Sequence, residues 1–368
     1  MKITQQIRQV MPPPVSLANA LRAQCPSHID LLDLSQAVPG YPPCQPVINA
    51  GVAALCDPAT HKYAPALGFE ALRVAHAEAE GVRVDQVAIT AGCNQAFAAT
   101  LQCLAERGRS VLVPTPYYFN HQMTLTMQGF HVIEWPCRED MGLDWEALPN
   151  LLQPDTCAIV LVSPNNPTGY VTPADDIARL LRVAEQHDCA LVLDETYRDF
   201  IDAVQRPTTI ASDHLIRLYS FSKAYAIAGE RVGSVIAAPA LIQQIEKVID
   251  CWAICAPKVG QIMALAGIGH AGDWLSDWRE RIQARERLML NELAGLAGYQ
   301  VASSGAYFAW LRYPVDRSST AEAEYWIKER GILALPAAVF GSAEAALRLA
   351  FANLDEAGIT ELGRRLRA

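Results

Sequence analysis

The chain has 368 residues, of which 51% are hydrophobic and 19% are charged, so it can bury a large core and form two domains. This composition excludes disordered and fibrous proteins. The formal net charge of −9 argues against nucleic acid or an anionic membrane as the main partner, because those surfaces select clusters of Lys and Arg.

The first residues contain no apolar stretch long enough for a signal peptide or a membrane span, and later apolar runs break within about ten residues. We therefore expect a soluble, cytoplasmic protein. Ten cysteines are scattered through apolar runs, without a Cys-x-x-Cys pair or a His spacing suited to zinc. We interpret them as buried free thiols and predict no metal site.

Short apolar runs alternate with helical patterns through the first two thirds of the chain. Segments such as 94–107 and 173–188 space their apolar residues at three and four, and Pro173 suits the start of the second helix. Continuous apolar strands between such helices predict an α/β fold, a three-layer arrangement with a mostly parallel sheet covered on both faces. The predicted strands are QVAIT (86–90), SVLVP (110–114), HVIEW (131–135), CAIVLV (157–162), ALVLD (190–194), LIRLY (215–219) and GSVIAA (233–238).

The pattern changes after about residue 255. A long helical region runs to about residue 297, and YQVASS, AYFAWLRY, ILALP and ALRLAFA then alternate with helices. This pattern predicts a smaller α+β domain, against which the Pro-rich segment before residue 46 is expected to pack. The predicted division is 46–255 for the large domain and 1–45 plus 256–368 for the small one.

Chemically distinctive residues follow the predicted strands directly. Because parallel strands end at one edge of a sheet, where such sheets bind ligands, we expect these side chains to meet. The first group opens a helix whose free N–H groups suit a phosphate. In chain order the groups are Gly92, Cys93 and Asn94, then Tyr117 and Tyr118, then the motif PNNPTG, then DETY with Asp194 and Tyr197, and then SFSK with Lys223.

Each feature alone has an ordinary structural explanation. Gly92 suits a tight turn, PNNPTG a loop, Asp194 a cap, and the paired tyrosines ordinary packing. Arg348 projects between two alanines on the face opposite Leu347 and Leu349, which favours anion binding over a surface salt bridge. Lys223 is one of six lysines and has only small neighbours in SFSKAYAIAGERVG. The shared order and location of these residues favour one site.

Together these residues resemble the class I/II aminotransferase family of pyridoxal 5'-phosphate (PLP) enzymes, within the fold-type I or aspartate aminotransferase superfamily. The resemblance implies an enzyme that moves an amino group between an L-amino acid and a 2-oxo acid by a ping-pong mechanism. It covers essentially the whole chain, through YAPALGFEALR (63–73), ITAGCNQAF (89–97), PNNPTG (164–169), DETY (194–197), SFSKAYAIAGERVG (220–233), SSGAYFAWL (303–311), LPAAVFG (335–341) and LRLAF (347–351).

The resemblance implies a role for each residue. Lys223 holds the cofactor as a Schiff base and moves a proton between the substrate α-carbon and the cofactor. Asp194 pairs with the pyridine nitrogen, and Arg348 binds the substrate α-carboxylate. Around the ring, Asn166 and Tyr197 contact the phenolate oxygen and Tyr118, rather than Tyr117, stacks on the ring face. The phosphate is held by Gly92, Cys93, Asn94, Ser220, Ser222 and Arg231.

The resemblance also implies a homodimer, because Tyr63 in this family reaches the cofactor phosphate of the neighbouring subunit. Ala37 stands where relatives often have a glycine close to the substrate carboxylate, so the stretch from Gln36 to Tyr41 is a predicted substrate contact. No second arginine can be assigned to a distal carboxylate. The aromatic residues Tyr41, Tyr117 and Tyr118 favour a bulky substrate.

Other reactions on the same scaffold stay open, namely a C–S β-lyase, an α-decarboxylase and an ACC-synthase-like γ-elimination. A decarboxylase fits poorly with Arg348, because a carboxylate held there lies in the ring plane. A PLP-binding sensor module is the alternative from another class. Such modules need a basic DNA-binding domain ahead of the fold, whereas the cofactor motifs here begin early in an acidic chain.

Overall fold

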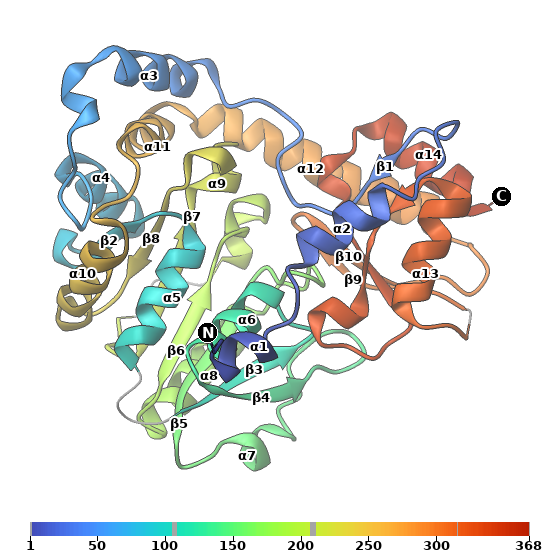
Figure 1. The fold of residues 1–368 in the computed structure, drawn as a ribbon, viewed down its shortest axis with the longest axis horizontal. Helices are drawn as coiled ribbons and strands as arrows, with labels where there is room; N and C mark the ends of the chain where they lie inside the picture. Colours follow the sequence, from blue (N-terminus) through green and yellow to red (C-terminus); the bar gives the residue numbers. More distant parts are fainter. Residues whose placement is uncertain (1, 105–108, 207–210, 315, 368) are drawn as a thin grey trace.

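The computed structural model describes residues 2–104, 109–206, 211–314 and 316–367. Within these residues the strands form a seven-stranded sheet, a four-stranded sheet and a two-stranded pair. Figure 1 places the large sheet in one half of the molecule and the four-stranded sheet in the other. The architecture is α/β, as the alternation of apolar strands and helices predicts.

The large sheet has the strand order β2-β8-β7-β6-β5-β3-β4. Strand β8 is antiparallel to both of its neighbours, and the other pairs are parallel. All seven predicted strands are therefore present, each within one or two residues of its predicted bounds. They are β2 (Val87–Thr90), β3 (Ser110–Thr115), β4 (His131–Pro136), β5 (Thr156–Val162), β6 (Ala190–Asp194), β7 (Leu215–Ser220) and β8 (Gly233–Ile236).

Helices cover both faces of this sheet. Val192 packs toward α5, α6 and α10, whereas its neighbours Leu191 and Leu193 pack toward α8. This burial on both faces explains why the strands read as unbroken apolar runs. The helices of this half are α3 (Gln45–Cys56), α4 (Glu70–Glu80), α5 (Cys93–Leu104), α6 (Phe119–Met127), α7 (Leu148–Leu151), α8 (Ala174–Gln186), α9 (Phe221–Ala224), α10 (Pro239–Ala253) and α11 (Lys258–His270).

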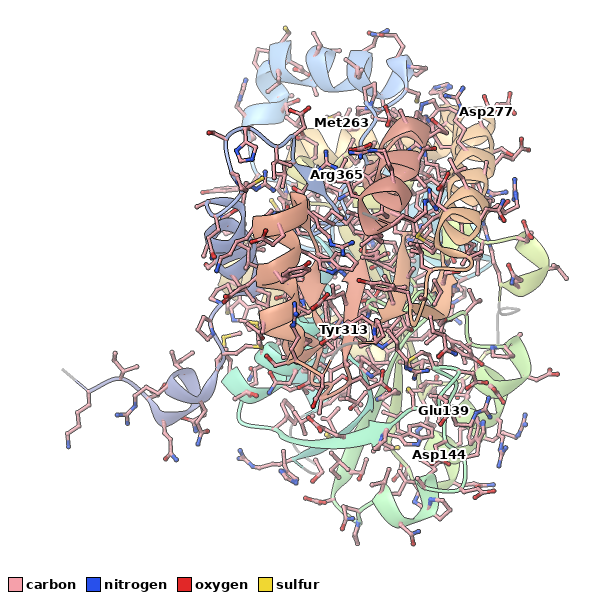
Figure 2. The ribbon with its side chains drawn as sticks, turned by 90° about the vertical axis from the view of Figure 1, so that its right-hand side faces the viewer. Glu139, Asp144, Met263, Asp277, Tyr313 and Arg365 are labelled. Atoms are coloured by element: carbon pink, nitrogen blue, oxygen red, sulfur yellow. The ribbon has the colours of Figure 1, made fainter. Side chains whose placement is uncertain are left out.

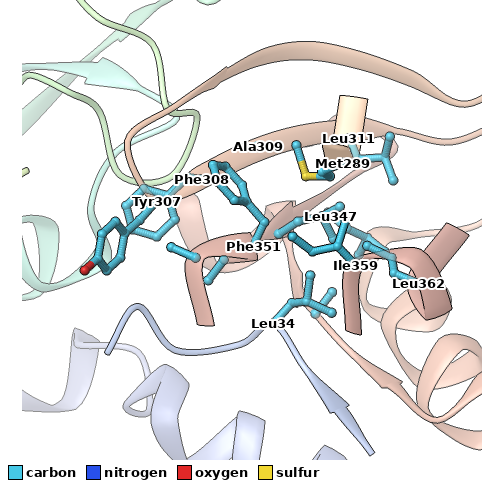
Figure 3. Close-up of a cluster of buried hydrophobic side chains, with 14 of the residues drawn as sticks. Leu34, Met289, Tyr307, Phe308, Ala309, Leu311, Leu347, Phe351, Ile359 and Leu362 are labelled. Atoms are coloured by element: carbon cyan, nitrogen blue, oxygen red, sulfur yellow. The ribbon is translucent and has the colours of Figure 1, made fainter. Parts of the chain in front are cut away.

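The four-stranded sheet is antiparallel, with the order β12-β13-β10-β9. Its core joins Phe308 and Leu347 of the sheet to Met289 and Ile359 of helices, and Leu34 from near the N-terminus packs into the same cluster (Figure 3). The elements are β9 (Gln300–Gly305), β10 (Phe308–Arg312), β12 (Leu335–Pro336), β13 (Ala346–Leu349), α12 (Gly272–Leu293), α13 (Ser319–Tyr325) and α14 (Glu356–Arg367).

The N-terminal segment lies with these late elements, as the sequence predicts. Strand β1 (Leu32–Asp33) pairs in parallel with β11 (Ile332–Leu333), and α2 (Pro14–Arg22) lies between the two halves in Figure 1. Helix α1 (Gln5–Gln9) has no buried residue and projects from the body of the molecule in Figure 2. Helix α11 packs on α3 and α4, and α12 packs on α14. The exact division into 46–255 and 1–45 plus 256–368 stays a prediction.

Across the described ranges, none of the helices combines the length and the apolar character needed to cross a membrane.

Candidate active site

A cavity of about 240 Å³ opens at the carboxyl ends of β5, β6 and β7, between the large sheet and the N-terminal and C-terminal segments. The structure brings to it most of the residues singled out from the sequence. Those that line it are Ala37, Cys93, Asn94, Tyr118, Asn166, Asp194, Tyr197, Ser220, Ser222, Lys223, Arg231 and Arg348. Gly92 lies directly behind this lining, whereas Tyr63 lies on the surface with 76% of its area exposed.

Lys223 lies on α9, a short helix that begins directly after β7 and is capped by the Ser220 hydroxyl. Its Nζ donates a hydrogen bond to the carbonyl oxygen of Ala37, which crosses from the N-terminal segment. Burial lowers the pKa of Lys223 from 10.5 to about 8, and the positive charges of Arg231 and Arg348 act in the same direction. A substantial fraction of this amine is therefore neutral and nucleophilic near pH 8.

Asp194 ends β6 and is buried. Burial alone would raise the pKa of its carboxyl, but hydrogen bonds from His121 and Thr196 hold that pKa below its ordinary value. His121 Nε2 lies 3.2 Å from Asp194 Oδ2, and the Thr196 hydroxyl donates to Asp194 Oδ1 at 2.6 Å. A buried carboxylate is thus kept charged at the floor of the cavity, where it can pair with a cationic group of a ligand.

Arg231 and Gly92 form a complementary pair at the turn before α5. Arg231 adopts a left-handed backbone conformation with φ 54°, and its Nη1 donates to the carbonyl oxygen of Ala228 at 2.9 Å. A Cβ at Gly92 would overlap the Arg231 guanidinium, so glycine is required there by space as well as by its φ of +82°. The guanidinium, the N-terminus of the 12-residue helix α5 and the hydroxyls of Ser220 and Ser222 together suit a phosphate.

Arg348 is the buried cation on the other side of the cavity. Its Nη1 donates to Asn166 Oδ1 at 3.0 Å, and its Nη2 donates to the carbonyl oxygen of Ser35. Burial lowers its pKa to about 10. The Nε of Arg348 is buried without a hydrogen-bond partner in the described part of the chain. A buried guanidinium without a carboxylate partner there points to an anionic ligand.

The two adjacent tyrosines face different ways. Tyr118 lines the cavity, accepts a hydrogen bond from Asn120 Nδ2 at 2.9 Å, and meets the His121 ring edge-on. Tyr117 lies outside this lining, because its ring packs against Gly341 and its hydroxyl is 3.5 Å from Glu134 Oε1.

Tyr41 also lies outside the lining. Its ring stacks on Trp278 with ring centroids 3.6 Å apart, and its hydroxyl bonds to that of Tyr307. Of the stretch from Gln36 to Tyr41, the structure places Gln36, Ala37 and Val38 on the cavity. Tyr41 and Tyr117 therefore do not support a bulky substrate, because their side chains pack outside the cavity.

A sequence model of the family described as aminotransferase class I and II matches residues 29–366. The chain belongs to this family. An aromatic aminotransferase from Arabidopsis thaliana is 27% identical over 91% of this chain and 89% of its own length. A probable aspartate/prephenate aminotransferase from Thermus aquaticus is 30% identical over 96% of both chains. The structure of a double mutant of Thermus thermophilus aspartate aminotransferase superposes with a TM-score of 0.91 at 26% identity, covering 100% of this chain and 99% of that one.

This aminotransferase family depends on PLP, and the cavity residues fit that cofactor. The lining supplies an amine for an aldehyde, a buried carboxylate for a protonated ring nitrogen, and a cation with hydroxyls and a helix N-terminus for a phosphate. The enzyme is thus a PLP-dependent aminotransferase, and neither relative named above is described as a lyase or a decarboxylase.

Sequence reasoning missed several residues of the cavity. His121, which contacts Asp194 but does not line the cavity, lies three residues after Tyr118 in the first turn of α6, and that spacing was the available signal for its position. Thr196, Ser35 and Phe119 were not singled out either. No local pattern indicated that Pro14, Val15 and Ala18 of α2 would reach the cavity, because that contact joins segments remote in sequence. The missed lining residues are Pro14, Val15, Ala18, Ser35, Gln36, Val38, Phe119, Val162, Thr196, Ala228 and Leu335, of which Gln36 and Val38 were included only in the wider range from Gln36 to Tyr41.

Proposed function

We propose that this aminotransferase runs two half-reactions in the one cavity, in which an L-amino acid leaves as a 2-oxo acid and a second 2-oxo acid then takes up the nitrogen. The convergence of an amine, a buried carboxylate and two separate guanidinium groups on that cavity is the observation that carries the proposal. The two cations suit the two anionic groups that must be held together, a cofactor phosphate and a substrate carboxylate.

When bound, the cofactor supplies an aldehyde that exchanges with amines and a ring that accepts an electron pair. We assign to Lys223 the covalent attachment of the aldehyde carbon and, once displaced, the transfer of the proton at the substrate α-carbon. Its lowered pKa supports both tasks, because an amine that releases its proton near pH 8 can act as a nucleophile and as a base.

Asp194 is assigned to the ring nitrogen, because a buried carboxylate that stays charged keeps a neighbouring pyridine protonated. Arg348 and Asn166 are assigned to the substrate α-carboxylate, with Ala37 beside it, since the Nε of Arg348 is left for an added acceptor. The remaining assignments are Tyr197 and Asn166 to the ring hydroxyl oxygen, Tyr118 to the ring face, and Gly92, Cys93, Asn94, Ser220, Ser222 and Arg231 to the phosphate.

We also infer a homodimer. Tyr63 is 76% exposed, and Val52 and Leu55, one turn apart on α3, are 58% and 59% exposed. The segment before Tyr63 contacts both α3 and α11, so these side chains belong to one region of the surface. In a dimer through this region, Tyr63 is proposed to reach the cofactor phosphate of the other subunit. Sedimentation of Leu55→Asp should give a lighter species than the unsubstituted chain, whereas an unchanged mass would contradict this interface.

The proposed location is the cytoplasm. All ten cysteines are free thiols in the structure, a pattern typical of proteins that reside in a reducing compartment, but the expectation that they are buried is wrong for Cys56 and Cys251, which are exposed. Detection of the protein in a cytoplasmic fraction, with ten titratable thiols after denaturation, tests this inference.

The test of function is the absorbance of the cofactor-loaded protein while single amino acids are added without a 2-oxo acid. Stoichiometric conversion of the cofactor to its amine form, with one equivalent of 2-oxo acid released, is expected. Lys223→Ala should lose this conversion by orders of magnitude, whereas Lys247→Ala, which alters an exposed lysine of α10, should retain it. Accumulation of ammonia, carbon dioxide or a thiol over many turnovers would instead indicate a lyase or a decarboxylase.

A further inference from the structure

The cavity has a wall that the assigned cofactor and carboxylate contacts do not use. Six apolar lining residues from four separate segments form this wall: Pro14, Val15 and Ala18 of α2, Val38 after β1, Phe119 at the start of α6, and Leu335 of β12. On α2, Val15 and Ala18 are three residues apart and Pro14 and Ala18 four, so one face of this helix is turned to the cavity.

The position of Leu335 relates this wall to the substrate carboxylate. In the antiparallel pair of β12 and β13, Leu335 is directly opposite Arg348. Side chains of directly opposed residues lie on the same face of a sheet, about 5 Å apart at their Cβ atoms. A substrate whose α-carboxylate is bound by Arg348 therefore has an apolar side chain beside it, and Leu335 belongs to the same buried cluster as Ala18 and Phe119.

The charges of the cavity decide what this wall can accept. Among the described lining residues the cations are Lys223, Arg231 and Arg348, and each already has a task in the proposed function. The arginine that α2 itself carries, Arg22, is paired with Asp33 and does not line the cavity. A second carboxylate on the substrate would therefore lose its water against this wall without gaining a cation from this chain, which is costly.

We propose that this wall is the subsite for the substrate side chain and that it selects amino acids with an uncharged, apolar side chain over dicarboxylic ones. This inference rests on the proposed function, because it takes Arg348 as the site of the α-carboxylate. Ala18, Phe119 and Leu335 are buried, whereas Val15 and Val38, with 47% and 43% of their areas exposed, place the outer end of the subsite at the mouth of the cavity. Long or branched side chains can therefore extend toward solvent along α2.

Binding of unreactive carboxylates tests the subsite without any turnover. Isocaproate, succinamate and succinate have similar shapes and end in an isopropyl group, an amide and a carboxylate, respectively. Calorimetric titration of the cofactor-loaded protein should give the tightest binding for isocaproate, by about tenfold over succinate, because apolar area is buried and no charge is stripped of water. Equal or tighter binding of succinate or succinamate would overturn the proposal.

A substitution in the wall tests whether the wall itself sets the order of binding. Val15→Arg places a cation on the half-exposed wall of α2, and it should reverse the order so that succinate binds more tightly than isocaproate. The matched control is Val204→Arg, which adds the same charge at a side chain that is 89% exposed and does not line the cavity. It should leave all three dissociation constants unchanged.

The two proposals fail in different measurements. A protein that converts no amino acid in the spectral titration refutes transamination, whatever the binding order. A protein that transaminates but binds succinate best refutes the apolar subsite alone.

Discussion

A buried ionic network behind the active site should make Glu80 a large contributor to stability. Glu80, on α4, forms ion pairs with Arg198 and with Arg217, and Arg217 Nε also donates to Glu195 at 2.7 Å. Glu195 follows Asp194 directly, and Arg198 follows Tyr197. The network therefore holds the segment that carries two of the predicted site residues.

The magnitude follows from the charge state of Glu80. Burial would raise the pKa of this carboxyl, but the hydrogen bond and charge of Arg198, with the charge of Arg217, lower it from 4.5 to about 2. Such a difference between the folded and unfolded chains is worth about 3 kcal/mol of unfolding free energy at neutral pH. Removal of one partner from a buried ion pair typically lowers the unfolding free energy by about 3–5 kcal/mol, and the value obtained from the pKa of Glu80 lies at the lower end of this range.

We therefore expect Glu80→Gln to lower the unfolding free energy by about 3 kcal/mol at pH 7, as measured by urea denaturation at fixed protein and cofactor concentrations. Because the folded pKa is depressed, this contribution is present above pH 4.5 and is lost as the pH falls toward about 2. The difference in unfolding free energy between Glu80→Gln and the unsubstituted chain should therefore disappear as the pH falls from 4.5 toward about 2. The control is Glu78→Gln, an exposed carboxyl on the same helix, which should change stability by less than about 0.5 kcal/mol. Equal effects of the two substitutions would refute the reasoning.

Three further predictions concern the site. The rate of covalent cofactor attachment to Lys223 should rise with pH and level off above about 8, because the neutral amine is the nucleophile; a flat absorbance-detected profile from pH 6 to pH 9 would contradict this. Arg348→Lys should reduce kcat/KM for the amino donor by about tenfold to a hundredfold, since a planar, charge-assisted contact is lost, and an unchanged value would exclude Arg348 as the carboxylate site. His121→Phe should move the acidic limb of the kcat/KM profile to higher pH, because without His121 burial raises the pKa of Asp194 and the carboxylate takes up a proton sooner. A profile that keeps its acidic limb would mean that Thr196 alone keeps Asp194 charged.

Much of the large half is determined by the sequence itself. A strand buried on both faces must be apolar at every position, so the runs around Val160 and Val192 stand out without any knowledge of their partners. The residues that follow such strands are placed by the same rule, because parallel strands end at one edge. For that reason Asp194, Lys223 and Asn94 could be grouped from their order along the chain, and the structure places all three on one cavity.

The tertiary structure decided what depends on contacts between remote segments. Tyr117 and Tyr118 are neighbours with the same chemistry, and only the packing of Tyr117 on Gly341 leaves Tyr118 on the cavity. Arg348 and Lys223 bond to backbone carbonyls of the N-terminal segment, more than 180 residues away in sequence. The apolar face of α2 likewise reaches the site through contacts between remote segments, among them the contact of α2 with β11. Local pattern encodes which face of an element is buried, whereas the partner that buries it is selected by the packing of the whole chain.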